Sequence, residues 1–99
     1  MLEAIRENDI LTIKLPERVD ASNAAEVEAD VDAVRNHDKP EIVVFDADKL
    51  TYISSAGLRI IIKVVKREQS ASVINVCPEV YEIFEVSGFT KFIRIERKA

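Results

Sequence analysis

The chain has 99 residues, of which 47% are hydrophobic and 32% are charged. This is enough to build the core of a single domain over residues 1–99 without disulfide bonds or bound metals. The formal net charge is −4 at pH 7, and the 14 Lys and Arg residues are scattered along the sequence. Nucleic acids and anionic membranes both select a clustered basic face, so neither is expected as the main partner.

Cysteine content and the absence of long apolar runs bear on the compartment. The single Cys77 excludes a disulfide within the chain, and its apolar neighbours predict a buried, unreactive thiol. Nothing at the start resembles a signal peptide, because Glu3, Arg6, Glu7 and Asp9 interrupt any apolar run. No stretch is long enough to span a membrane. We therefore expect a cytoplasmic protein with no membrane insertion.

The N-terminal residues 2–15 predict a β-hairpin. Asn8 and Asp9 offer a tight turn in its middle. Apolar residues alternate with polar ones along its second half: Leu11, Ile13 and Leu15. Pro16 ends the hairpin, because proline cannot donate a hydrogen bond to a neighbouring strand.

An amphipathic helix is expected from Ala24 to about Asn36. Three preceding side chains, Asp20, Ser22 and Asn23, could each cap its first turn. The apolar positions recur at the spacing of one helix face: Ala24, Val27, Val31 and Val34. Acidic residues fill the opposite face, which we expect to be solvated.

The run from Ile42 to Phe45 is continuously apolar, which predicts a central parallel strand buried on both faces. A polar segment follows and leads into Thr51–Arg59, where a second helix begins. Its apolar stripe is formed by Leu58, Ile61, Ile62 and Val65, and Ile60 and Val64 widen it. Lys66 and Arg67 suit its C-terminus, where the helix dipole favours cations.

A second short strand is expected at Val73–Val76 and a third helix from Pro78, with Gly88 as its left-handed stop residue. Phe92–Ile95 predicts a closing edge strand. Strands that alternate with helices imply parallel pairing with right-handed crossovers. The predicted fold is therefore α/β: a small, mostly parallel β-sheet with an N-terminal antiparallel hairpin and three main helices.

In sheets of this kind, partners use the loops beyond the carboxyl ends of the strands. Two such loops, residues 17–23 and 46–55, are expected to lie together. They would bring Asp20, Ser22 and Asn23 towards Ser54 and Ser55. A helix start with two hydroxyls is either an ordinary cap or a place for a phosphate, because its free N–H groups favour negative charge.

Catalytic constellations are missing from the sequence. His37 has no second histidine or nearby cysteine to complete a metal site, and Cys77 has no histidine partner. Two glycines in the whole chain are too few for a glycine-rich phosphate loop, and Ser55 lacks the preceding glycine of a nucleophile elbow. We therefore expect no enzyme activity, no metal and no cofactor. An enzyme or nucleotide-binding protein is the least favoured hypothesis.

The sequence resembles the STAS domain, specifically the stand-alone anti-sigma factor antagonists of bacteria. The resemblance rests on RVDASNA at Arg18–Ala24 and VVFDADKLTYISSAGLR at Val43–Arg59, with FEVSGF at Phe84–Phe89 as an extension. It implies a protein that binds an anti-sigma factor, itself a serine kinase, and so releases a sigma factor. It also implies that the kinase phosphorylates a serine at the start of the second main helix, and that a metal-dependent serine phosphatase reverses this.

When the sequence is aligned with the family at Gly57 and Leu58, the family's phosphoacceptor position corresponds to Ser55, with Ser54 as the alternative acceptor. Ser54 stands where the family often has an aspartate, and Glu17 where it often has a glycine. The resemblance implies a partner-binding face built from Asp20, Ser22, Asn23, Ser54, Ser55 and Gly57. Some related domains are not phosphorylated and only dock, for example in transporter, lipid-trafficking or other signalling complexes, so this remains the second hypothesis.

Overall fold

The computed structural model of the chain describes residues 2–67 and 70–99. Strands β1, β2, β4, β6 and β7 form one sheet in that order, and β3 and β5 form a separate pair. The bounds are β1 (Ala4–Glu7), β2 (Ile10–Lys14), β3 (Arg18–Val19), α1 (Ala24–Asp38), β4 (Ile42–Asp46), β5 (Tyr52–Ile53), α2 (Ser55–Arg67), β6 (Ala71–Val76), α3 (Pro78–Val86), the 3-10 helix η1 (Phe89–Lys91) and β7 (Arg94–Arg97).

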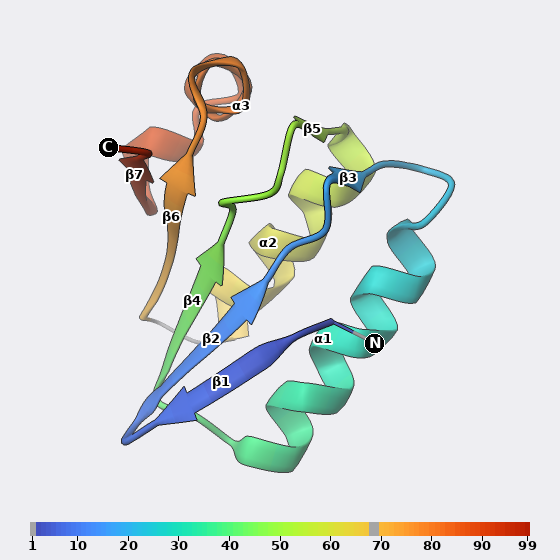
Figure 1. The fold of residues 1–99 in the computed structure, drawn as a ribbon, viewed down its shortest axis with the longest axis vertical. Helices are drawn as coiled ribbons and strands as arrows, with labels where there is room; N and C mark the ends of the chain where they lie inside the picture. Colours follow the sequence, from blue (N-terminus) through green and yellow to red (C-terminus); the bar gives the residue numbers. More distant parts are fainter. Residues whose placement is uncertain (1, 68–69) are drawn as a thin grey trace.

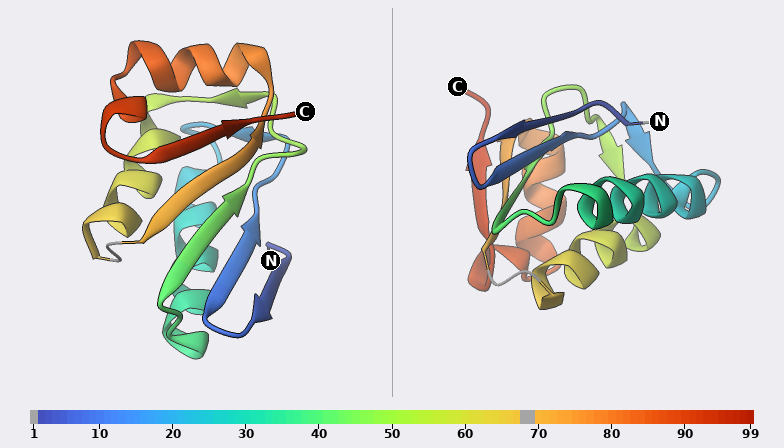
Figure 2. Two further views of the ribbon diagram at one scale, coloured as in Figure 1. Left: turned by 90° about the vertical axis from the view of Figure 1, so that its left-hand side faces the viewer. Right: turned by 90° about the horizontal axis from the view of Figure 1, so that it is seen from below.

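The strand pairing confirms the predicted α/β fold. β1 and β2 form an antiparallel hairpin whose turn residue Asn8 has a φ of 55°. The pairs β2–β4, β4–β6 and β6–β7 are all parallel, and β7 lies at an edge of the sheet. Helices α1 and α2 lie along one face of this sheet, while α3 lies beyond the carboxyl end of β6 (Figures 1 and 2).

The core lies between the sheet and helices α1 and α2 and continues to α3 and η1, which add Val80, Phe84 and Phe89. On β4, Val43 and Phe45 face this core and are fully buried, whereas Ile42 and Val44 point to the opposite face and are half-buried. The prediction that this strand is buried on both faces is therefore wrong. Among the described residues, no helix covers the second face (Figure 2).

Several boundaries and side-chain placements differ from the predictions. Helix α1 runs on to Asp38, and its Arg35 is only 6% exposed, although the sequence placed it on no core face. The closing strand begins at Arg94 rather than Phe92, because the chain first makes the 3-10 turn η1 after Gly88, whose φ is 84°. Cys77 is half-buried rather than buried, and its thiol donates to the Leu50 carbonyl oxygen at 3.6 Å.

Candidate functional site

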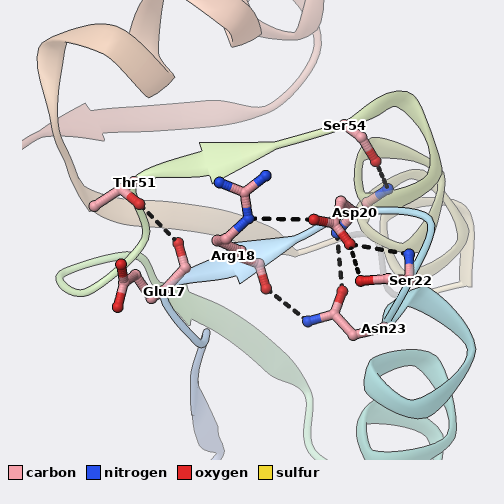
Figure 3. A network of polar contacts seen from close by, with 8 residues as sticks. Glu17, Arg18, Asp20, Ser22, Asn23, Thr51 and Ser54 are labelled. Atoms are coloured by element: carbon pink, nitrogen blue, oxygen red, sulfur yellow. Dashed lines mark hydrogen bonds and ion pairs between the residues drawn. The ribbon is translucent and has the colours of Figure 1, made fainter.

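The two predicted loops do lie together, and a small parallel sheet joins them. β3 pairs with β5 in the register Arg18 to Tyr52 and Val19 to Ile53. Backbone hydrogen bonds extend the pairing on both sides, from Thr51 N to Glu17 O at 2.8 Å and from Ser54 N to Val19 O at 2.9 Å. The loop before α1 and the loop before α2 are thereby fixed to one another (Figure 3).

Asp20 organises the loop before α1 (Figure 3). Its carboxylate accepts hydrogen bonds from the Ser22 hydroxyl at 2.5 Å, from the Ser22 backbone N–H at 2.9 Å and from the Arg18 Nε at 3.2 Å. These donors, the Ser22 hydroxyl foremost, hold the pKa of Asp20 below its usual value. Asp20 is therefore a fixed negative charge at neutral pH.

Asn23 holds the same loop and does not cap α1 through its side chain, although it occupies the N-cap position. Its Oδ1 accepts from the Asp20 N–H at 2.9 Å, and its Nδ2 donates to the Arg18 carbonyl oxygen at 2.7 Å. The Ala24 N–H is satisfied instead by the backbone oxygen of Asp20 at 2.8 Å. The predicted side-chain cap of α1 is wrong, because the three polar side chains are used within the loop.

The two serines before α2 have different environments. Ser54 is half-buried and occupies the position before the helix, where its hydroxyl accepts from the Gly57 N–H at 3.4 Å and its carbonyl from the Leu58 N–H at 2.9 Å. Ser55 is the first residue of α2 and is exposed. Within residues 2–67 and 70–99, the Ser55 hydroxyl makes no hydrogen bond. One hydroxyl is thus a cap, and the other is available to a partner.

Gly57 lies beneath this surface and is buried. A Cβ at this position would lie 2.6 Å from the Ile53 Cγ1, 2.8 Å from the Val19 Cγ1 and 3.0 Å from the Val19 carbonyl oxygen. Its missing side chain lets the first turn of α2 lie directly against β3 and β5. Gly57 therefore shapes the site by packing and presents no side chain to a partner.

Sequence reasoning did not assign a role to Arg18 or Tyr52, which join the two loops at the surface. The Arg18 guanidinium lies over the Tyr52 ring, with its Cζ 4.9 Å from the ring centroid, and the ring is 40% exposed. Both residues fall inside the stretches that carry the family resemblance. Their pairing depends on the β3–β5 register, which local sequence does not reveal.

The described residues contain no group of three or more His, Cys, Asp or Glu side chains that could hold a metal ion. The same residues include no helix with both the length and the apolar character needed to cross a membrane. The geometry of the site offers an exposed hydroxyl, an ionised carboxylate and an aromatic ring on a surface fixed by backbone hydrogen bonds. Such a surface suits recognition by another protein.

Comparisons with known proteins agree with this geometry. Residues 1–99 match the family model of the STAS domain. A Bordetella bronchiseptica protein named "Putative anti-sigma factor antagonist BtrV" is 43% identical over 76 residues, which are 72% of this chain and 64% of that protein. The chain therefore spans less than two thirds of the length of this relative.

Two solved structures share the fold. An anti-sigma factor antagonist from Mycobacterium paratuberculosis matches with a TM-score of 0.85 at 18% identity, over 97% of this chain and 84% of that one. The anti-sigma factor antagonist SpoIIAA in its unphosphorylated form matches with a TM-score of 0.78 at 13% identity, over 96% and 87%. The predicted resemblance in fold is confirmed.

Proposed function

The chain belongs to the STAS domain family, and from this membership and the site above we propose that it is an anti-sigma factor antagonist controlled by phosphorylation of Ser55. Relatives in sequence and in structure carry the name of such antagonists. In this proposal residues 1–99 form a single STAS domain that acts by binding, not as an enzyme, in the cytoplasm. It binds an anti-sigma factor, itself a serine kinase, and so releases a sigma factor.

The exposure of the Ser55 hydroxyl is the observation that carries this proposal. A kinase must reach the hydroxyl that it modifies, and Ser55 is exposed whereas Ser54 is half-buried and bonded to the Gly57 N–H. A phosphate on Ser55 would carry about −1.5 to −2 charges at neutral pH. The start of α2 would stabilise that charge by roughly 0.3–1 kcal/mol.

Phosphorylation would change the charge of the partner-binding face without a change in its fold. The face already carries the ionised Asp20, and the β3–β5 pairing fixes its two loops. An added phosphate would place more negative charge and more bulk next to α2, so that the partner would be repelled or would no longer fit. The partner would then dissociate, and a serine phosphatase would restore binding. The kinase supplies ATP and magnesium, so this chain needs no cofactor.

The experiment is phosphorylation by the anti-sigma kinase encoded nearest to this chain, with ATP and magnesium, followed by mass spectrometry of the modified peptide. We expect one phosphate on Ser55 in the wild-type chain and in Ser54→Ala, and none in Ser55→Ala. Phosphate on Ser54, or a chain that binds the kinase and stays unmodified, would contradict the proposal. The second of these results, with function intact in Ser55→Ala, would indicate a docking domain that works without phosphorylation.

A further inference from the structure

We propose that the groove between α1 and α2 binds a small anion with an apolar body. This groove has a volume of about 370 Å³, which is in the range of small-molecule sites. Its lining residues all belong to α1 and α2, the two helices that lie side by side on one face of the sheet (Figure 2, right). Ser54, Ser55 and the loop that holds Asp20 are not among them. The proposal therefore does not depend on the proposed function.

The floor of the groove is apolar. Val31 on α1 and Ile60 and Val64 on α2 line it, and each of these side chains is at most 5% exposed. A hydrocarbon or aromatic group placed on this floor would lose contact with water on the side that faces these residues. A fully hydrated inorganic ion would gain nothing from these three residues. The floor thus selects a ligand with an apolar part.

The walls of the groove carry an excess of positive charge. Among the residues that the structure describes, four cationic side chains and two carboxylates line it, although the whole chain has a net charge of −4. The carboxylates belong to Glu28, which pairs with Lys63 across the groove, and to Asp32, which lies 3.6 Å from the buried Arg35. A local positive field of this kind in an acidic protein selects an anion.

Two of the cations are available to a ligand. Lys66 and Arg67, in the last turn of α2, line the groove and make no ion pair within the described part of the chain. The helix dipole favours cations at this end of α2. Arg67 can hold a carboxylate through two parallel hydrogen bonds. The ligand would lay its apolar body on the floor and turn its anionic head towards these two residues.

The test is to titrate the full chain with each of three probes: decanoate, inorganic phosphate and octanol. The backbone amide signals in NMR report binding. Decanoate carries both features, and each of the other probes carries one. We expect decanoate to shift the amides of α1 and α2 that line the groove. Phosphate and octanol at the same concentration should leave those amides unchanged.

The double variant Lys66→Gln and Arg67→Gln should weaken decanoate binding about tenfold, because it removes both cations that the anionic head of the ligand would contact. The double variant Lys49→Gln and Arg59→Gln is the matched control, since it loses the same charges at exposed positions that do not line the groove. It should bind as the wild type does. No shift with decanoate, an equal response to phosphate alone, or equal weakening in the control would overturn the proposal.

Discussion

At the scale of single residues, Gly57 is the position in the site with the least space for a side chain. It is buried where the first turn of α2 meets β3 and β5, and the nearest atoms include the Val19 carbonyl oxygen. That oxygen also accepts the Ser54 N–H, so it cannot move away without loss of the hydrogen bond that ties α2 to β3. The close approach, rather than backbone conformation, explains the glycine.

We predict that Gly57→Ala destabilises the protein by about 1–2 kcal/mol. An added methyl group in a packed interior costs roughly 1–3 kcal/mol, which exceeds the gain of up to about 1 kcal/mol from the better helix propensity of alanine. Urea unfolding followed by circular dichroism measures the difference. An unchanged or raised unfolding free energy would show that Ile53 and Val19 can move aside.

The sequence predicted which loops of the candidate site lie together but not all of the contacts that their residues make. Asp20, Ser54 and Ser55 were expected at one end of a parallel sheet, and the β3–β5 pairing does bring their loops together. The bonding of Asn23 was not predictable, because its side chain could either cap α1 or hold the Arg18 carbonyl oxygen. Only the position of the loop relative to α1 decides between these two.

At the scale of elements, the start of α2 gives the two serines different environments. The Ser54 hydroxyl satisfies one N–H of the first turn, whereas the Ser55 hydroxyl satisfies none. We predict that Ser54→Ala lowers the unfolding free energy by about 0.5–1 kcal/mol, at the low end for a lost cap because the bond is 3.4 Å long.

Ser55→Ala is the matched control for this element, since it removes the neighbouring hydroxyl from an exposed position. Its unfolding free energy should stay within about 0.5 kcal/mol of the wild type. Chemical denaturation of both variants under the same conditions gives the comparison. Equal losses in the two variants would mean that the Ser54 hydroxyl contributes nothing specific to the helix start.

The elements that the sequence missed are the short ones. β3 and β5 have two residues each, and no periodicity can be detected in two residues. Their pairing joins segments more than thirty residues apart, so it depends on the sheet being formed. The turn η1 was not predicted, and the last strand was predicted to begin at Phe92, two residues before β7, because Phe92 and Ile93 are apolar and local pattern does not separate the end of a turn from a strand.

At the scale of the whole molecule, the order of strands and helices was enough to predict the mostly parallel sheet. It was not enough to predict how the helices are shared between the faces. A continuous apolar strand such as Ile42–Phe45 suggests cover on both sides, yet α1 and α2 lie on the same face and α3 lies beyond the end of β6 (Figure 2). The site depends on that arrangement, because it leaves the start of α2 and the Asp20 loop exposed together.

This arrangement makes the proposed switch a change of surface charge in an unchanged fold. Ser55→Asp should therefore keep the circular dichroism spectrum and raise the unfolding free energy by at most about 1 kcal/mol, since a carboxylate in the first turn suits the helix dipole. Calorimetric titration with the anti-sigma kinase should show binding weakened by up to a few kcal/mol, with a smaller loss at high salt. Ser55→Asn introduces a side chain of the same size as aspartate but without its charge. This variant should bind nearly as well as the wild type. If it binds as poorly as Ser55→Asp, the face responds to size rather than charge, and electrostatic repulsion is not the mechanism.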